Sequence, residues 1–275
     1  MENPVLRAAH LSVAFQKPGQ PMLQAVKDIS LSVMEGEAVC LVGPSGCGKS
    51  VTSQALMGLL PPDGVVTGGQ IIWNGQDMTH ASERNFRTIR GSVASMLFQE
   101  PAASLDPVRT LGWQMDEVLN MRTSLTKEQR RQRAIRLFDE VGLPAPERQC
   151  RAYPHQLSGG MCQRAMIAIA LAAEPKLLLA DEPTTGLDTT IQLQILELLR
   201  REQRQRGMAL LLITHDMGVV ARMADRVIVM SEGRDVEQGE VRTLFSAPRH
   251  PVTKALLQAA REAVGPLGQK GGEAG

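Results

Sequence analysis

The chain has 275 residues and a formal net charge of +1 at pH 7; 43% of its residues are apolar and only 3% are aromatic. A nearly balanced charge excludes strong long-range attraction to nucleic acid or to an acidic membrane surface. The apolar fraction is sufficient for a sizeable core, which must be built mostly from aliphatic side chains and methionine.

The cysteines and the apolar stretches indicate the compartment of the protein and its relation to membranes. Cys40, Cys47, Cys150 and Cys162 form no CxxC pair and lack zinc-finger spacing. Two of them lie in or beside a glycine-rich loop, where a disulfide would obstruct a ligand, so we expect free thiols in a reducing compartment. The first residues lack the basic start and apolar run of a signal peptide. The longest apolar stretches are far below the roughly 20 residues that span a bilayer, so any role at a membrane is expected to need a partner.

The first part of the chain predicts strands. Residues 5–42 read as short β segments, and the last of them, AVCLV at 38–42, is continuously apolar, as expected of a strand buried on both faces. A helical pattern follows the glycine-rich loop and runs to Pro61 and Pro62. Residues 68–78 predict a hairpin with an Asn-Gly turn at 74–75.

From about 104 to 172 the pattern becomes helical. Within 126–143, Ile135, Leu137, Phe138 and Val141 recur near helical spacing among charged residues. Because acidic residues interrupt the basic ones, we interpret this stretch as a solvated helix with one packed face rather than as a nucleic-acid-binding patch.

The last part predicts alternating strands and helices. In order, we expect a strand at 176–183, a helix at 190–207, a strand at 209–214, a helix at 216–225 and a strand at 226–230. This alternation predicts a mainly parallel sheet covered by helices, with the helical stretch at about 100–172 inserted into it as a subdomain. We expect a single domain over 1–264 and a disordered tail at 265–275.

The sequence GPSGCGKS at 43–50 fits the phosphate-binding pattern G-x-x-x-x-G-K-[ST]. A strand precedes it and a helix follows, as the motif requires. Glycines let backbone N–H groups point inward, and the helix N-terminus adds the positive end of its dipole. Lys49 is expected to reach the β- and γ-phosphates of ATP, and Ser50 a Mg²⁺ ion. The alternative is an ordinary glycine-rich turn between a strand and a helix.

We assign ATP binding to this loop and the residue after it: Gly43, Pro44, Ser45, Gly46, Cys47, Gly48, Lys49, Ser50 and Val51. Cys47 stands near the helix N-terminus, whose dipole favours a thiolate. This suggests the hypothesis that thiol reagents inactivate the protein and that ATP protects it. The alternative is an inert small residue in the turn.

Polar residues follow three of the apolar segments. LLLADEP at 177–183 ends in Asp181, expected to be a Mg²⁺ ligand through water, and Glu182, expected to polarise the attacking water as general base. Surface charge or a helix cap is the alternative for this pair. His215 follows another strand and is expected at the crevice where such sheets bind ligands, with a structural histidine as the alternative. Gln99 is expected to complete the Mg²⁺ coordination and to respond to the presence of the γ-phosphate. This assignment depends on the other motifs.

A second glycine-rich turn opens another helix. In LSGGM at 157–161, Ser158 can cap a helix that begins with Gly159 and Gly160, which creates a second anion-binding helix N-terminus. Taken alone, such a turn is usually only a cap.

Together these motifs resemble the nucleotide-binding subunit of an ABC transporter over about residues 5–258. The motifs stand in family order: GPSGCGKS, the Gln99 loop, LSGGM, LLLADEP, GLD at 186–188 and His215. The resemblance implies an α/β fold with a P-loop (RecA-like) ABC ATPase core, an antiparallel β subdomain and an inserted α-helical subdomain.

The resemblance also implies how two such subunits share ATP. They meet head to tail, so that Ser158, Gly159 and Gly160 of one cover the ATP held by the phosphate loop of the other. Phe15 then stacks on adenine, where many family members have Tyr. Gln99 lies between the core and the helical subdomain, and Asp188 lies at the dimer interface.

A narrower resemblance concerns the peptide/opine/nickel uptake branch. The stretches that carry it are 55–62, 96–114, 158–171 and 247–260. It implies uptake of peptides or nickel and other metal chelates, powered by ATP hydrolysis at the cytoplasmic face of the bacterial inner membrane, where the chain is peripheral. Cys162 stands where many peptide-uptake members have Arg, which leaves the substrate class open. The short tail lacks the cysteines of many peptide-uptake subunits, and this shifts the expectation toward nickel or metal chelates.

The implied partners are a second ATP-binding subunit, two transmembrane permease subunits and an extracytoplasmic solute-binding protein. The second ATP-binding subunit is a related chain, with an identical copy as the alternative; no nucleic acid is expected. The rival function is a soluble ABC ATPase acting on nucleic acid. Such proteins insert a long coiled coil between the two glycine turns, whereas only about a hundred residues without sustained heptads separate Lys49 from Ser158.

Overall fold

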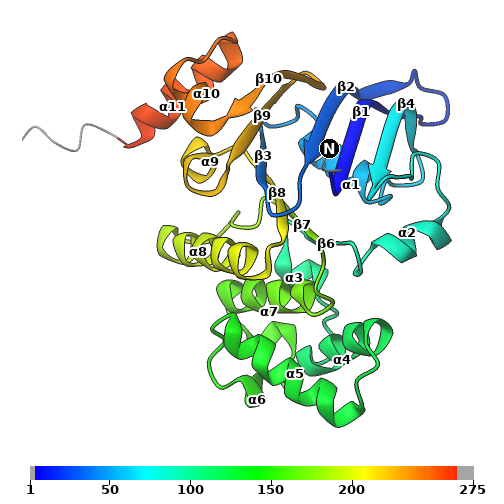
Figure 1. The fold of residues 1–275 in the computed structure, drawn as a ribbon, viewed down its shortest axis with the longest axis vertical. Coiled ribbons are helices and arrows are strands. Elements are labelled where there is room, and N and C mark those ends of the chain that lie inside the picture. Colours follow the sequence, from blue (N-terminus) through cyan, green and yellow to red (C-terminus); the bar gives the residue numbers. More distant parts are fainter. Residues whose placement is uncertain (1–3, 265–275) are drawn as a thin grey trace, which may run out of the picture.

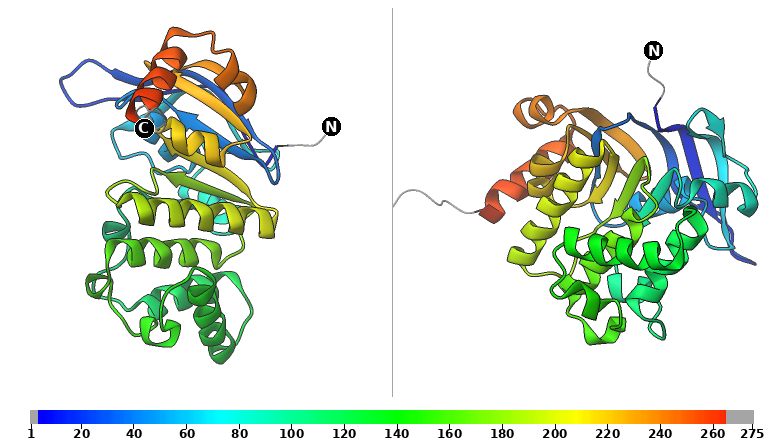
Figure 2. Two further views of the ribbon diagram at one scale, coloured as in Figure 1. Left: turned by 90° about the vertical axis from the view of Figure 1, so that its left-hand side faces the viewer. Right: turned by 60° about the horizontal axis from the view of Figure 1, so that its bottom comes forward.

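The structure is a computed structural model that describes residues 4–264. The tail expected at 265–275 lies outside the described residues. Figures 1 and 2 show a curved sheet with helices on its faces; the helices α4–α7 gather at the end of the molecule away from β1, β2 and β4.

Within the described residues, ten strands form one mixed sheet. They are β1 (Leu6–Phe15), β2 (Leu23–Val33), β3 (Ala38–Val42), β4 (Gly64–Trp73), β5 (Gln76–Asp77), β6 (Ala94–Leu97), β7 (Leu177–Asp181), β8 (Ala209–Thr214), β9 (Arg226–Ser231) and β10 (Arg234–Glu240). Their spatial order is β5-β4-β1-β2-β10-β9-β3-β8-β7-β6. The run from β9 to β6 is parallel, while β2, β1, β4 and β5 pair antiparallel. The expected parallel core and the implied antiparallel subdomain are therefore both present.

The helices divide into three groups along the chain. Before β6 lie α1 (Lys49–Leu56) and α2 (Glu83–Ile89). Between β6 and β7 lie α3 (Pro101–Ser104), α4 (Leu111–Arg122), α5 (Lys127–Glu140), α6 (Pro146–Gln149), the 3₁₀ turn η1 (Pro154–Gln156) and α7 (Gly159–Leu171). After β7 come α8 (Thr189–Arg206), α9 (Met217–Met223), α10 (Val241–Ser246) and α11 (Pro251–Val264). No helix in the described part of the chain is both long and apolar enough to cross a bilayer.

The central parallel strands are buried on both faces. All five residues of β3 and of β7, and all six of β8, are buried. In β3, Cys40 and Val42 belong to the core on one face of the sheet, whereas Val39 and Leu41 belong to the core on the other. This alternation follows from the two-residue period of a strand, and it explains why the sequence of these strands is continuously apolar.

Two turns show how local sequence sets the boundaries of elements. The expected hairpin joins β4 to β5 through Asn74 and Gly75, both with positive φ (47° and 79°), as a tight hairpin turn with right-handed twist requires. Helix α1 ends at Leu56, earlier than the expected stop at Pro61. The reason is Gly58, which has a φ of 62° and whose Cβ, if present, would lie 2.5 Å from the Phe86 ring.

The expected amphipathic helix at 126–143 is α5, which begins with a capping box between Thr126 and Gln129. Leu137, Phe138 and Val141 are buried, while Ile135 is half-buried. One face of α5 therefore packs into the helical part of the molecule, as the spacing predicts.

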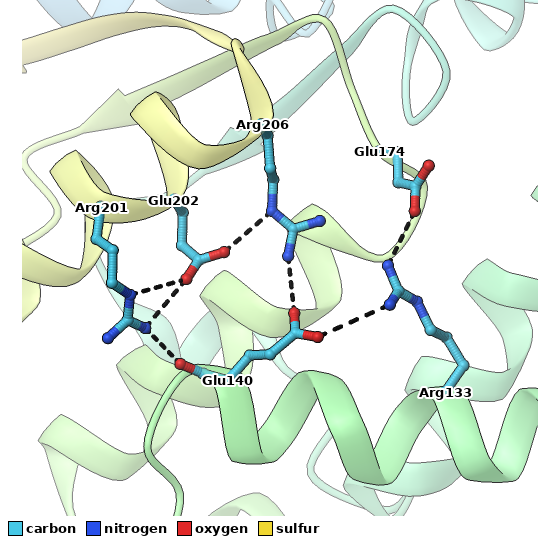
Figure 3. A network of polar contacts seen from close by, with 6 residues as sticks. All are labelled: Arg133, Glu140, Glu174, Arg201, Glu202 and Arg206. Atoms are coloured by element: carbon cyan, nitrogen blue, oxygen red, sulfur yellow. Dashed lines mark hydrogen bonds and ion pairs between the residues drawn. The ribbon is translucent and has the colours of Figure 1, made fainter.

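A network of charged side chains fastens α5 to α8 (Figure 3). Glu140 at the end of α5 accepts a hydrogen bond from Arg206 of α8 at 2.8 Å, and its carbonyl accepts one from Arg201. Both arginines also bond Glu202 at 3.0 Å, a carboxylate whose side chain is only 3% exposed. On the other side of Glu140, Arg133 lies 3.8 Å away and also pairs with Glu174. The network connects the inserted helices to the core.

Candidate functional site

The glycine-rich loop lies between β3 and α1 and has the conformation that a phosphate loop requires. Gly46 and Gly48 have positive φ values of 77° and 108°. A Cβ at Gly43 would lie 2.1 Å from the carbonyl oxygen of Met230, so only glycine fits there. Gly48 caps α1 without a side-chain bond, which leaves the first N–H groups of this helix available to an anion.

Lys49 lies inside the curve of this loop. Its side chain is 6% exposed, and its Nζ donates hydrogen bonds to the carbonyl oxygens of Gly43 at 2.8 Å and Pro44 at 2.9 Å. The loop therefore holds the ammonium group in one position beside the helix N-terminus. This arrangement concentrates positive potential at one point, which suits the phosphates of a nucleotide.

Cys47 does not have the chemistry that the dipole argument predicts. Its side chain is 7% exposed, with Sγ pointing into the loop about 4.0 Å from the Lys49 Nζ. Burial raises the pKa of the Cys47 thiol, and this effect outweighs the lowering by the Lys49 charge and by backbone N–H groups. The expectation of a thiolate is therefore wrong, because desolvation disfavours the charged form more than the helix end favours it.

Ser50, in the first turn of α1, is hydrogen-bonded to Asp181 at the end of β7. The Ser50 hydroxyl donates to Asp181 Oδ1 at 3.2 Å, and the Ser53 hydroxyl donates to Oδ2 at 3.0 Å. Burial raises the pKa of the Asp181 carboxyl, and the two hydroxyls offset this only in part. A hydroxyl and a carboxylate side by side are oxygen donors of the kind that Mg²⁺ prefers. Ser53 was not expected from the sequence, since the phosphate-loop pattern ends at Ser50.

Glu182 and His215 form a pair at the ends of neighbouring strands. His215 Nδ1 lies 3.0 Å from Glu182 Oε1, and the Thr185 hydroxyl donates to Oε2 at 2.8 Å. Burial raises the pKa of Glu182, but the hydrogen bonds from His215 and Thr185 outweigh it and hold this pKa below its usual range. The carboxylate is therefore ionised at neutral pH and able to accept a proton.

Of these residues, Lys49, Ser50, Glu182 and His215 line one cavity of about 350 Å³. Its lining residues are Ala25, Ser45, Gly46, Gly48, Lys49, Ser50, Val51, Gln99, Glu182 and His215. Gln99 enters it from the segment between β6 and α3, where the chain leaves the sheet for the inserted helices. Ala25, from β2, was not expected, because an alanine carries no chemical signal in a sequence.

Phe15 lies apart from the lining of this cavity. It ends β1, is half-buried, and pairs with Leu23 and Gly64 on the neighbouring strands. The structure thus places it at the end of the antiparallel strands, on the element next to β2, which contributes Ala25 to the cavity.

The second glycine turn also lies outside the cavity. Ser158 caps α7 by accepting a hydrogen bond from the Met161 N–H at 3.4 Å, and Asp188 caps α8 in the same way through Ile191 at 3.0 Å. The two helix starts pack together, since a Cβ at Gly160 would lie 2.9 Å from Ile191 Cγ2. Gly159 has Leu187 as its nearest neighbour, 3.6 Å from a Cβ built there. Phe15 apart, the predicted site residues therefore form two groups, one around Lys49 and one around Ser158.

Comparison with known proteins identifies this arrangement. The sequence profile of the family described as "ABC transporter" matches residues 26–185. A solved structure titled as the dimeric structure of MJ0796, a bacterial ABC transporter cassette, superimposes with a TM-score of 0.77 at 28% identity and covers 86% of this chain and 99% of the cassette. A second structure of the same cassette, in a post-hydrolysis state bound to ADP and phosphate, gives a TM-score of 0.76. The chain therefore belongs to the ABC transporter family and is one of its ATP-binding and ATP-hydrolysing cassettes.

Proteins of similar sequence show to which branch of the ABC transporter family the chain is related. The dipeptide transport ATP-binding protein DppD of Escherichia coli is 50% identical over 258 residues, covering 94% of this chain and 79% of DppD. The oligopeptide transport ATP-binding protein OppD of Bacillus subtilis is 46% identical over 254 residues, covering 92% of this chain and 71% of OppD. Within the family, the chain groups with ATP-binding subunits of peptide transport systems. The resemblance read from the motifs is thereby confirmed, and the rival nucleic-acid function is not favoured.

Proposed function

We propose that this chain binds ATP and Mg²⁺ in the cavity around Lys49 and hydrolyses ATP to power the uptake of peptides. The observation that carries the proposal is the convergence of Lys49, Ser50 and the Glu182–His215 pair at one cavity, with Asp181 hydrogen-bonded to Ser50 at its edge. Three segments far apart in the sequence supply these groups, so they meet only through the fold.

In this proposal the phosphate loop binds the triphosphate. Residues 43–51, of which all but Pro44 carry a backbone N–H, surround the phosphates, and Lys49 pairs with the β- and γ-phosphates. Phe15 supports the adenine. Ser50, Asp181 and Gln99 would hold Mg²⁺, which neutralises charge on the phosphate oxygens. The buried carboxylate of Asp181, already aligned by two serine hydroxyls, supports this donor set.

The hydrolytic step depends on Glu182 and His215. The ionised Glu182 carboxylate takes a proton from a water molecule while that water attacks the γ-phosphorus in line with the departing ADP oxygen. His215 holds one carboxylate oxygen through Nδ1, and when the ring carries both of its protons, Nε2 at its opposite edge can donate to a phosphate oxygen. The products are ADP and inorganic phosphate.

A second cassette completes each site. The cavity around Lys49 contains none of Ser158, Gly159, Gly160 or Asp188. We infer that these residues cover the ATP of an opposing subunit, and that the opposing subunit is a related ATP-binding chain. The cassette pair then assembles with two transmembrane permease subunits at the cytoplasmic face of the inner membrane, and an extracytoplasmic binding protein delivers the solute.

Peptides are the proposed cargo because the relatives at 46–50% identity are dipeptide and oligopeptide transport proteins. The shift toward nickel that the short tail suggested has no specific support from these relatives. We assign the single cassette domain to residues 1–264, with the helices between β6 and β7 as its inserted subdomain.

Two variants test the proposal. Lys49→Ala should abolish nucleotide binding, because it removes the charge at the centre of the loop. Glu182→Gln should retain ATP and trap a closed pair of cassettes, because the water loses its base while the phosphate ligands remain. Calorimetric titration with ATP and steady-state phosphate release separate the two effects. Hydrolysis by Glu182→Gln at the parental rate, or parental ATP affinity in Lys49→Ala, would contradict the assigned roles.

A further inference from the structure

The Glu182 carboxylate is held at both of its oxygens by residues from two different segments. Oε1 lies 3.0 Å from His215 Nδ1, beyond the end of β8, and Oε2 accepts the 2.8 Å hydrogen bond from the Thr185 hydroxyl in the loop before α8. The Thr185 N–H also donates to the Glu182 carbonyl at 3.2 Å, which closes a tight turn over residues 182–185. Thr185 is therefore tied to Glu182 through both its backbone and its side chain.

The backbone of Glu182 also has an unusual conformation. Its φ is +45°, a conformation that non-glycine residues adopt rarely and that clusters at functional sites. Its N–H donates to the Ile213 carbonyl on β8 at 2.9 Å, so the neighbouring strand holds the backbone in this conformation. The backbone of the residue is fixed by β8, and its side chain is fixed by His215 and Thr185.

We propose that Thr185 is a positioning residue for ATP hydrolysis, whose hydroxyl fixes the Glu182 carboxylate in the orientation from which it accepts the proton of the attacking water. The inference rests on the proposed role of Glu182 as general base. A glutamate side chain has three rotatable bonds, and hydrolysis requires its oxygen within hydrogen-bonding distance of one water. A hydrogen bond to an ionised carboxylate is strong enough to select one orientation.

The hydrogen bond from Thr185 does not prevent the Glu182 carboxylate from accepting a proton from water. Each carboxylate oxygen accepts more than one hydrogen bond, so Oε2 bonds Thr185 and still has a free lone pair for water. The adjacent Thr184 offers a natural comparison. Within the described chain its hydroxyl makes no hydrogen bond, although its backbone carbonyl accepts one from Leu187. The proposed role therefore belongs to one hydroxyl of two neighbouring threonines.

The test compares Thr185→Val, Thr185→Ser and Thr184→Val in the full chain, purified with the subunits with which it assembles. Valine keeps the shape of threonine and removes the hydroxyl, while serine keeps the hydroxyl. We expect Thr185→Val to lower kcat about 3- to 10-fold, a partial loss because His215 still holds the other oxygen. The KM for ATP should stay within about 2-fold of the parental value, because the phosphate ligands are untouched. Thr185→Ser and Thr184→Val should turn over at close to the parental rate.

Glu182→Gln, measured alongside, separates the inference from the function on which it rests. An inactive Glu182→Gln together with a parental kcat in Thr185→Val overturns only the positioning role. A Thr185→Ser variant as slow as Thr185→Val also overturns it, since packing and not the hydroxyl would then be responsible. A parental rate in Glu182→Gln overturns the general base and the inference together.

Discussion

At the scale of single residues, the environment of a side chain decides its chemistry more than its place in a motif. Cys47 occupies a helix N-terminus, where a lowered thiol pKa is expected. In the structure, burial raises that pKa instead, and burial also raises the thiol pKa values of Cys40, Cys150 and Cys162. The sequence reveals the dipole but not the burial, so the reactive-thiol hypothesis loses its physical basis.

The cysteines should therefore react slowly in the folded protein. The thiolate is the reactive form, and a raised pKa lowers its fraction at pH 7.5, so we expect alkylation at least about 10-fold slower in the native chain than in urea. The rate should increase as the pH rises beyond 9. Mass spectrometry of iodoacetamide-labelled peptides measures each site separately. Labelling of native Cys47 at the unfolded rate would show that its thiol is neither buried nor protonated.

At the scale of elements, local signals were read correctly and long-range ones were not available. Continuous apolar runs predicted β3, β7 and β8, and the Asn-Gly pair predicted the β4–β5 turn, because each depends on a few adjacent residues. Gly58, just past the end of α1, is a local stop signal, whereas the close approach of the Phe86 ring that leaves no space for a Cβ there could not be read locally. Likewise the Ser53 hydroxyl acquires its partner, Asp181, only when β7 and α1 come together.

The ion network between α5 and α8 is another element-scale feature, and it predicts a stability effect. Glu140→Gln removes the charge that Arg133 and Arg206 share, so we expect the free energy of unfolding to fall by about 1 kcal/mol. The difference should shrink at high salt, because screening weakens the parental network. Urea unfolding at low and high ionic strength measures both effects.

Glu128→Gln is the matched control for that variant. Glu128 lies at the opposite end of α5 and pairs with Arg131 at 3.5 Å, where both side chains are largely exposed. An exposed pair of this kind contributes little, so we expect a change below about 0.5 kcal/mol. Equal losses in the two variants would mean that the network of Figure 3 adds nothing beyond ordinary surface charge.

At the scale of the whole molecule, the motifs and the family resemblance predicted two half-sites in one chain, but not the packing that holds them apart. The motif order led to the cassette fold, and the fold was confirmed by its solved neighbours. The resemblance implied that the Ser158 turn and the Lys49 loop of one chain serve different ATP molecules, and the structure accordingly leaves the Ser158 turn out of the cavity lining around Lys49. How the Ser158 turn packs against the start of α8 was visible only in the structure. The functional unit inferred from this separation is a pair of cassettes.

The variant Ser158→Asp tests the proposed pair of cassettes without unfolding the chain. Aspartate caps a helix as well as serine, so α7 should remain intact, but the new charge would face the γ-phosphate of the opposing subunit's ATP. Turnover should fall at least about 10-fold through like-charge repulsion, while ATP affinity at the Lys49 loop of the variant chain stays parental. Ser82→Asp, the same change at the exposed N-cap of α2, should leave turnover unaltered. Parental turnover in Ser158→Asp would show that this turn approaches no phosphate, and each cassette would then have to complete its own site.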